Sequence, residues 1–555
     1  MQFIFLRPYI AASFNNLSVN ANKAEQSRGE KEKGGALFSS ICSGTIYGLQ
    51  SHLIQVEVDV SRGLPCLVMV GSLGSEVRES QERVKVALKN SGMDIPPSHI
   101  SVNLSPADIH KSGTGFDLAI ALGILTATEI LDAKMLADVF VIGELGLSGE
   151  IKGVKGVLPL VWEAFRQGKK QCLVPRDNYA EASVIEGIRV AGAGSIQEAC
   201  DYLQLSEEEQ VKEELKQRRQ EAEAQREWKK RDHRQEEKAL DFAEVHGQEN
   251  LKRGALIAAA GFHHMLIVGP PGAGKTMIAK RIPSILPELN FEESMEVTSI
   301  YSIAGRLPKG QNLIKKRPFL NPHHSVTIHA LAGGGRIPQP GLVSLAHRGV
   351  LFLDELPEFQ RQTIDLLRQP LEDKEIHIAR STGAFTYPAD FMLVGAMNPC
   401  PCGYYPDRNR CKCTPFERHL YRSRLSGPML DRMDLCLEAE KVEIGQFQKK
   451  KSGLSSAEMR EMVNRARELQ ESRYKGTDIK FNSDLTMKDC EKYCCLGKQE
   501  QSYTERLSEK MQLSARGYHH LLKVARTIAD LEGSEEIRLP HLAEAMSYRN
   551  MEPER

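Results

Sequence analysis

The chain has 555 residues, more than a single hydrophobic core supports, so we expect several domains. Lys plus Arg and Asp plus Glu balance at 73 each, which excludes a globally basic nucleic-acid-binding protein and requires any contact with a polyanion to come from a local patch. No apolar run is long enough to span a bilayer, and the short apolar start is interrupted by Arg7, so we predict a cytoplasmic protein with no signal peptide and no membrane partner.

The first 240 residues divide by composition into three parts. Residues 1–36 are rich in Asn, Ser, Lys and Glu, which predicts disorder or an upstream extension. Residues 37–205 alternate apolar strands with amphipathic helices, which predicts a compact α+β domain. The strands are expected at 55–60, 66–70, 100–104 and 139–142, and the helices at 77–91, 117–128 and 157–168. Residues 206–240 carry charges of both signs, which favours a solvated helical linker over a DNA-binding segment.

A phosphate-binding loop follows, between a predicted strand at 265–268 and a predicted helix at 277–281. Its glycines allow successive backbone N–H groups to point at phosphates, and the start of the helix adds a positive potential. Lys275 would reach the β- and γ-phosphates of ATP, and the Thr276 hydroxyl would ligate Mg²⁺. The loop consists of Gly269, Pro270, Pro271, Gly272, Ala273, Gly274, Lys275 and Thr276.

Two further strands end in polar residues. The apolar run at 350–353 ends in Asp354 and Glu355, a pattern typical of a Walker B strand, in which Asp354 would hold Mg²⁺ and Glu355 would orient and deprotonate water. After a predicted hairpin, a buried strand leads to Asn398, which could bond the attacking water or the γ-phosphate, because ligands gather at the carboxyl ends of parallel strands. The alternative is that Asn398 only caps a turn. We assign residues 241–445 to this nucleotide-binding domain and 446–555 to a helical lid, which includes helices at 513–531 and 540–548.

Four cysteines lie close together within residues 400–413. Cys400, Cys402, Cys411 and Cys413 form two CxC pairs, whose thiolates could converge on a tetrahedral Zn²⁺ and fold a loop that lacks a core of its own. The spacing differs from the commoner CxxC, so reduced or redox-active thiols remain the alternative. A second group, Cys490, Cys494 and Cys495, is expected to be ordinary helical residues of the surface or core.

Residues 400–432 also form a basic, aromatic strip. They contain seven Lys or Arg against three Asp or Glu, interleaved with Tyr404, Tyr405, Phe416 and Tyr421. Such a strip can contact phosphates and stack on bases, which makes single-stranded or branched DNA a candidate partner. Arg432 is a candidate arginine finger for a neighbouring subunit, but spacing alone favours a local salt bridge with Asp431 or Asp434.

Several blocks of this sequence together resemble the YifB/ComM group of magnesium-chelatase-like AAA+ ATPases. They lie at 317–324, 333–335, 340–347, 351–359, 367–372, 398–403 and 421–427. The resemblance covers residues 37–548 and implies a P-loop AAA+ core with a C-terminal helical lid. It also implies a homo-oligomeric ring, a hexamer, with ATP sites between subunits and with the segments 317–341 and 376–387 facing the pore. In that scheme Asn398 is sensor 1, Arg432 is the arginine finger and Arg516 is sensor 2.

The resemblance leaves two kinds of substrate open. ComM-type members are implied to be DNA helicases that drive branch migration during natural transformation. The magnesium-chelatase subunit and MoxR-type ATPases are implied to remodel proteins with the same ATPase. The four cysteines and the N-terminal domain favour the DNA motor.

The N-terminal domain resembles the Lon-protease-like, ribosomal-S5-type fold through residues 111–122 and 143–150. A Lon-like protease requires a serine nucleophile and a lysine base, but Gly115 stands where the serine is expected and Ser112 is displaced from that position. We therefore expect this domain to serve assembly or DNA contact, and an ATP-dependent protease is disfavoured.

Overall fold

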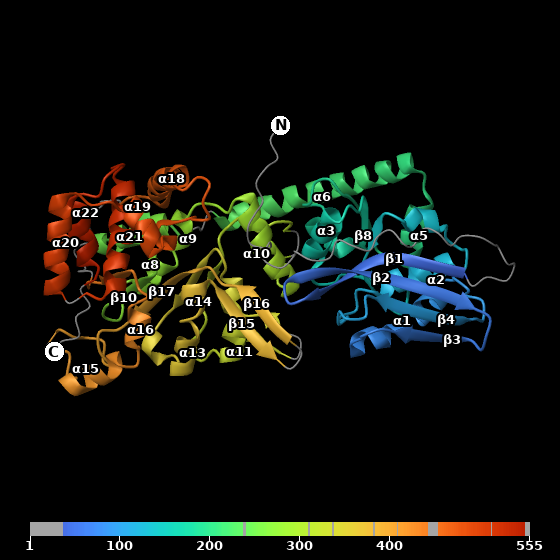
Figure 1. Ribbon diagram of the computed structural model, residues 1–555, viewed down its shortest axis with the longest axis horizontal. Helices are drawn as coiled ribbons and strands as arrows, with labels where there is room; N and C mark the ends of the chain where they lie inside the picture. The colour runs from blue at the N-terminus through green and yellow to red at the C-terminus, as the bar shows by residue number, and fades with distance from the viewer. Residues whose placement is uncertain are drawn as a thin grey trace.

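The computed structural model describes residues 37–236, 240–308, 311–335, 338–380, 383–407, 409–441, 453–511 and 513–549. The predicted extension at 1–36 and the predicted boundary at 445–446 lie outside these residues. The molecule is elongated, with the N-terminal part at one end and the C-terminal helices at the other (Figure 1). Within the described residues, no helix combines the length and the apolar character needed to cross a bilayer.

The N-terminal part folds as an α+β unit. Its main elements are β1 (Leu37–Tyr47), β2 (Gln50–Ser61), β3 (Cys66–Val70), α1 (Ser75–Asn90), β4 (His99–Ser105), α2 (Asp117–Ala127), β5 (Val139–Val141), β6 (Glu144–Leu145), β7 (Ile151–Lys152), α3 (Val157–Arg166), β8 (Gln171–Pro175), α4 (Tyr179–Ala182), β9 (Arg189–Ala193) and α5 (Ile196–Gln204). Seven of the strands form one mixed sheet in the order β3-β4-β2-β1-β5-β8-β9. Helix α2 is buried along its whole length, which places it at the centre of this core.

The predicted strands and helices of this part coincide with β2 to β5 and α1 to α3, but the sequence patterns missed β1, β8 and β9. Strand β1 was missed because its buried face carries Ser39, Ser43 and Thr45, which hide the apolar alternation. The Ser39 hydroxyl is satisfied by a distant partner, since its Oγ donates to the carbonyl of Gly123 at 2.7 Å.

The charged segment after this unit is a helix, α6 (Glu207–Glu236), as expected, but its first half is not a free linker. Glu214 accepts hydrogen bonds from the Arg189 guanidinium at 2.9–3.1 Å. The Gln217 side chain pairs with both backbone groups of Gly192, at 2.9 and 3.1 Å. Helix α6 therefore covers the open edge strand β9, whose unpaired backbone groups would otherwise remain unbonded.

The second half of the chain contains a parallel sheet and a helical C-terminal part. The elements before the lid are α7 (Glu249–Gly261), β10 (Met265–Val268), α8 (Lys275–Ala279), α9 (Ile282–Ile285), α10 (Phe291–Ile303), β11 (Phe319–Leu320), α11 (Ile328–Ala332), β12 (Gly333–Gly334), β13 (Gln339–Pro340), α12 (Leu342–Leu345), β14 (Val350–Leu353), α13 (Arg361–Leu366), α14 (Pro370–Asp373), β15 (Glu375–Arg380), β16 (Gly383–Pro388), β17 (Met392–Met397), α15 (Pro415–Arg422), α16 (Gly427–Leu430) and β18 (Leu435–Glu438). The C-terminal helices are α18 (Ser456–Arg473), α19 (Met487–Tyr493), α20 (Lys498–Lys510), α21 (Ala515–Leu531) and α22 (Leu539–Ser547). One hydrophobic cluster runs from β10 through α7 into α21, which joins the sheet to the C-terminal helices.

The five strands of the second sheet are parallel and lie in the order β11-β14-β17-β10-β18. The predicted strands at 265–268 and 350–353 coincide with β10 and β14. Because β10, β17 and β14 are neighbours, the residues that follow their carboxyl ends meet at one edge of the sheet. The predicted helix at 277–281 differs, since α8 already begins at Lys275 and a new helix with Pro283 in its first turn follows at Ile282.

Among the described residues, two regions of contact join the halves of the molecule. The turn between β1 and β2 packs on the β15–β16 hairpin, where the rings of Tyr47 and Phe385 lie 4.6 Å apart. At the second contact, the Ser302 hydroxyl donates to the buried carboxylate of Glu181 at 2.6 Å. The β15–β16 hairpin, which was expected to face a pore, thus packs one of its faces against the N-terminal unit.

Candidate nucleotide site and thiol cluster

A cleft of about 480 Å³ opens where the carboxyl ends of β10, β14 and β17 meet. It is lined by Pro271, Gly272, Ala273, Gly274, Lys275, Thr276, Met277, Asp354, Glu355, Met397 and Asn398. The structure therefore brings together the loop, the two acids and the asparagine that sequence patterns selected from three separate segments. Gly272 and Gly274 adopt φ values of +77° and +84°, which side chains other than glycine rarely adopt.

Lys275 lies at the centre of the cleft. Its Nζ donates to the carbonyls of Gly269 at 2.6 Å and Pro270 at 3.1 Å, and to Oδ1 of Asn398 at 3.0 Å. Burial lowers the pKa of Lys275, against the opposing charges of Asp354 and Glu355. All three bonded oxygens are neutral, so the ammonium retains a charge that the phosphates of a nucleotide would balance.

Thr276 and Asp354 form the second element of the cleft. The Thr276 Oγ1 donates to Asp354 Oδ2 at 2.7 Å, so a hydroxyl and a carboxylate from two separate segments point at the same place. Mg²⁺ binds through oxygen ligands of this kind and commonly uses one or two protein groups together with phosphate oxygens. The pair fits a magnesium ion brought by a nucleotide.

Glu355 projects from the end of β14 with its side chain 57% exposed. Its backbone is left-handed, with φ 52° and ψ 46°, a conformation that costs roughly 1–2 kcal/mol for a residue with a side chain. His324 Nδ1 lies 3.6 Å from Glu355 Oε2. His324 was assigned no role from the sequence. The signal that could have found it is the short strand β11, which pairs in parallel with β14. The loop after β11 therefore reaches the same edge of the sheet as Glu355, and His324 lies in this loop.

Arg432 and Arg516 do not line this cleft. Both bind one carboxylate, since Arg432 contacts Oε2 of Glu372 and Arg516 Nη2 lies 3.3 Å from its Oε1. The two guanidiniums hold the pKa of Glu372 below its usual range. The expected local bridge from Arg432 to Asp431 or Asp434 is wrong, because the fold brings Glu372 to Arg432 and commits Asp434 to a contact with His520.

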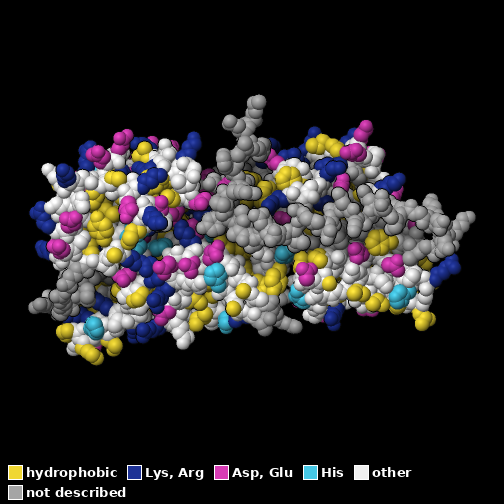
Figure 2. All heavy atoms as spheres, in the orientation of Figure 1, with side chains coloured by type: hydrophobic (Ala, Val, Ile, Leu, Met, Phe, Trp, Pro, Cys, Tyr) yellow, Lys and Arg dark blue, Asp and Glu magenta, His cyan; other side chains and the backbone are white. Residues whose placement is uncertain are grey.

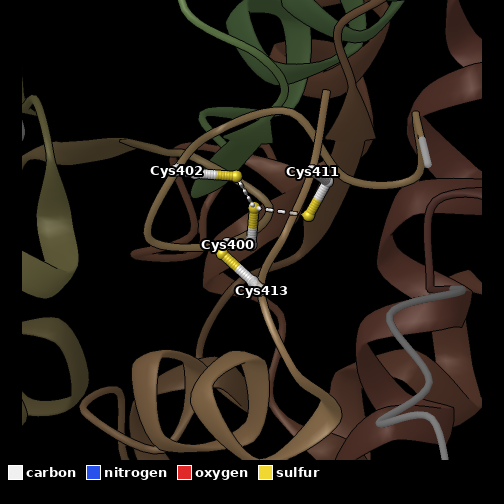
Figure 3. Close-up of side chains that lie close together, drawn as sticks. All are labelled: Cys400, Cys402, Cys411 and Cys413. Atoms are coloured by element: carbon white, nitrogen blue, oxygen red, sulfur yellow. Dashed lines mark hydrogen bonds between the residues drawn. The ribbon is translucent and has the colours of Figure 1, made fainter. Parts of the chain in front are cut away.

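The four cysteines converge as their spacing predicts (Figure 3). Cys400 Sγ lies 3.4 Å from Cys402 Sγ and 3.7 Å from Cys411 Sγ, and all four sulfurs lie within 4.8 Å of one another. Four thiolates around one zinc ion at Zn–S distances of about 2.3 Å would be separated by about 3.8 Å. A hydrogen bond from the Tyr404 backbone is the largest cause that lowers the pKa of Cys402 to about 7. Desolvation and contacts with Cys400 and Cys402 raise the pKa of Cys411 and of Cys413, so the four thiols differ in pKa.

Comparisons with known proteins match this arrangement. A family model described as magnesium chelatase, subunit ChlI, matches residues 241–447, a C-terminal model of that subunit matches 453–549, and a further ChlI model matches 56–178. The chain is 41% identical to competence protein ComM of Haemophilus influenzae, over 91% of this chain and 96% of that protein. It is 42% identical to YifB of Escherichia coli, over 90% and 95%. The chain belongs to the YifB/ComM family of magnesium-chelatase-like AAA+ ATPases.

The family accounts for the cleft, since magnesium-chelatase-like AAA+ proteins use ATP and Mg²⁺. A more distant relative, the magnesium-chelatase 38 kDa subunit of Rhodobacter capsulatus, is 26% identical over 28% of this chain and 50% of that protein. The similarity to ComM and YifB thus extends over both halves of the molecule. The similarity to the chelatase subunit covers only a part of this chain.

The basic, aromatic strip of this YifB/ComM chain is only partly available for stacking. Tyr421 is buried, and the Arg418 guanidinium lies 4.0 Å from the Tyr405 ring, so these two rings are less available to stack on bases than Tyr404 and Phe416. Phe416 is 73% exposed on α15, which projects from the lower left of the molecule in Figure 1. Hydrophobic side chains are visible at this tip in Figure 2, where Leu420 is exposed as well.

In the N-terminal unit, the Lys111 side chain is buried, and its ammonium group donates a hydrogen bond to the carbonyl of Pro106. The neighbourhood of Gly115 is occupied as well, because a Cβ there would lie 3.1 Å from Ile142. Neither observation favours a serine–lysine pair. In the second cysteine group, Cys490 and Cys494 are buried and Cys495 is exposed. Only Cys490 lies in a helix, α19, so the prediction that all three are helical is wrong for Cys494 and Cys495.

Proposed function

We propose that this protein is an ATP-hydrolysing, ring-forming motor that acts on DNA. The proposal for hydrolysis is carried by the convergence of the phosphate loop with Asp354, Glu355 and Asn398 in one cleft. Lys275 binds the phosphates, while Thr276 and Asp354 hold Mg²⁺. Glu355 takes the proton of the attacking water, and Asn398, bonded to Lys275, orients the water or the γ-phosphate.

A ring is supported by the position of the two arginines. Both bind Glu372, and neither lines the cleft of its own chain. We propose that Arg432 acts as the arginine finger in a neighbouring subunit's site, and that Arg516 acts as sensor 2 on the lid, where both stabilise the charge that develops on the phosphates. A hexamer is the assembly that the family resemblance implies, with the N-terminal Lon-like unit serving assembly or DNA contact.

DNA is the proposed substrate because of the exposed side chains of the four-cysteine loop and of α15, which follows it. Arg410 and Lys412 are exposed within the four-cysteine loop, and Phe416 is exposed on the helix that follows it, so this region offers cations for phosphates and a ring for a base. The full-length similarity to a protein named for competence supports the same substrate, with branch migration during natural transformation as its setting. The partial similarity to a magnesium-chelatase subunit supports a protein-remodelling ATPase as the alternative.

Single-stranded or branched DNA is expected to raise ATP turnover several-fold, and salt between about 50 and 200 mM is expected to abolish most of this effect, because phosphate contacts release counterions. Replacing Arg410 and Lys412 with serine should weaken DNA binding and stimulation. The matched control replaces the exposed Lys498 and Lys510 of α20 with serine and should respond to DNA as the wild type does. If no DNA form binds at low salt and an unfolded polypeptide stimulates turnover, the remodelling alternative replaces the DNA motor.

We also propose that the four-cysteine loop holds one structural Zn²⁺. The purified protein is expected to contain about one zinc per chain, and Cys402→Ser or Cys411→Ser should lower this to near zero, because three ligands bind far more weakly than four. Cys495→Ser is the control, since this thiol is exposed and lies outside the cluster. Wild-type protein that is active and free of metal would leave reduced or redox-active thiols as the explanation.

A further inference from the structure

The four-cysteine loop is attached directly to the nucleotide cleft. Cys400 follows Asn398 by two residues, and Asn398 Oδ1 accepts a hydrogen bond from Lys275 Nζ at 3.0 Å. Cys400 is fully buried, and its Sγ lies within 3.7 Å of two other cluster sulfurs. Whatever fixes the position of Cys400 therefore restricts the backbone that carries Asn398.

A second attachment runs through Gly403. This residue has a φ of +82°, and its N–H donates to the carbonyl of Cys400 at 3.0 Å, which closes the turn that contains Cys402. A Cβ at this position would lie 2.6 Å from Cδ and 2.8 Å from Cγ of Pro271. The turn therefore rests on the phosphate loop itself, and the proline ring cannot rotate away from it.

A third attachment comes from the far end of the loop. Helix α15 begins at Pro415, two residues after Cys413, and its buried Tyr421 side chain hydrogen-bonds the backbone of Asn398. Both ends of the loop thus hold Asn398, and its middle supports Pro271. Apart from Cys400 and Gly403, the described loop residues are not buried, so hydrophobic packing contributes little to its rigidity.

We propose that the four-cysteine loop is a positioning element of the nucleotide site. When its thiols hold a metal ion, the loop fixes Asn398 and the outer turn of the phosphate loop. Loss of the ion frees both, so metal occupancy sets the affinity for nucleotide. This inference rests on the proposed zinc site and ATPase function, but its readout is nucleotide binding and does not require hydrolysis.

The first test removes zinc from the wild-type protein with a chelator that is then dialysed away, and measures the Kd of a fluorescent ATP analogue. The Kd is expected to rise roughly tenfold and to recover when zinc is restored, whereas added Mg²⁺ alone should not restore it. Cys402→Ser should show the weak Kd without chelation. An unchanged Kd after complete zinc removal would overturn the proposal.

The second test breaks the contact and keeps the metal. Gly403→Ala is expected to retain its zinc but to bind the analogue roughly tenfold more weakly, because the new methyl group displaces Pro271. Gly476→Ala is the matched control, since Gly476 has a φ of +83° and nothing within 4 Å of its Cβ position. Adding Pro271→Ala to Gly403→Ala should recover part of the affinity, because the smaller side chain relieves the overlap.

Equal affinities for Gly403→Ala and Gly476→Ala would overturn the coupling. If Gly403→Ala itself loses zinc, the chelation experiment decides alone. Wild-type protein that binds the analogue in a zinc-dependent manner but never hydrolyses ATP would contradict the proposed function and leave the coupling intact.

Discussion

Replacing Glu355 with glutamine is expected to lower ATP turnover by about 10²–10⁴-fold while ATP binding stays within about twofold. The amide has the size of the carboxylate but cannot take a proton from water, and Glu355 makes none of the hydrogen bonds that position Lys275. Its left-handed backbone is not expected to change, because both side chains have the same branching. Steady-state turnover and the Kd for ATP measure the two effects separately.

Glu358→Gln is the matched control for this substitution. Glu358 lies three residues further on, is also partly exposed, and pairs with Arg424 at 3.0 Å instead of facing the cleft. We expect its turnover to remain within about twofold of the wild type, since an exposed ion pair contributes little. A Glu355→Gln enzyme with near-normal turnover would exclude Glu355 as the base.

Arg432→Ala is expected to lower turnover by roughly a thousandfold or more, because a guanidinium at the γ-phosphate stabilises the charge of the transition state. The side chain is only 9% exposed and binds Glu372, so loss of folding must be excluded first by comparing thermal melting with the wild type. Arg432→Lys should not restore activity, since an ammonium lacks the planar pair of donors.

Mixing the two inactive variants tests where Arg432 acts. In a ring, a subunit with intact Glu355 can receive Arg432 from a Glu355→Gln neighbour, so mixed Arg432→Ala and Glu355→Gln should recover a substantial fraction of turnover. Lys275→Ala mixed with Glu355→Gln should stay inactive, because both changes lie in the same half of the site. If the mixture of Arg432→Ala and Glu355→Gln recovers no turnover, Arg432 does not act in a neighbouring subunit's site and serves only as the partner of Glu372 in its own chain.

The segments that could be predicted from the sequence are those with local signals. The strands before Gly269 and Asp354 are short, apolar and bounded by loop residues, and both coincide with observed strands. Parallel strands collect the residues at their carboxyl ends, so the meeting of Lys275, Asp354 and Asn398 follows from the places of these residues along the chain. The convergence of the four cysteines was equally local, since two CxC pairs are separated by one short loop.

Local patterns failed where the deciding contact was distant. Strand β1 was missed because its buried face carries hydroxyl groups, one of which, on Ser39, bonds the distant carbonyl of Gly123. Helix α6 has the polar composition of a solvated linker, but some of its polar side chains bind the edge of a sheet. Composition alone does not distinguish side chains that bind a sheet edge from side chains that face water.

Spacing along the chain was therefore enough to select the groups of the candidate site, namely the phosphate loop, the two acids after β14, an asparagine and four thiols. Tertiary structure decided how these parts are connected. Glu372 joins arginines that lie 60 and 144 positions away, and Gly403 rests on Pro271. The physical reason is that a motif needs only a fixed spacing along the chain, whereas a contact between distant residues exists only after the sheet has placed their loops at one edge.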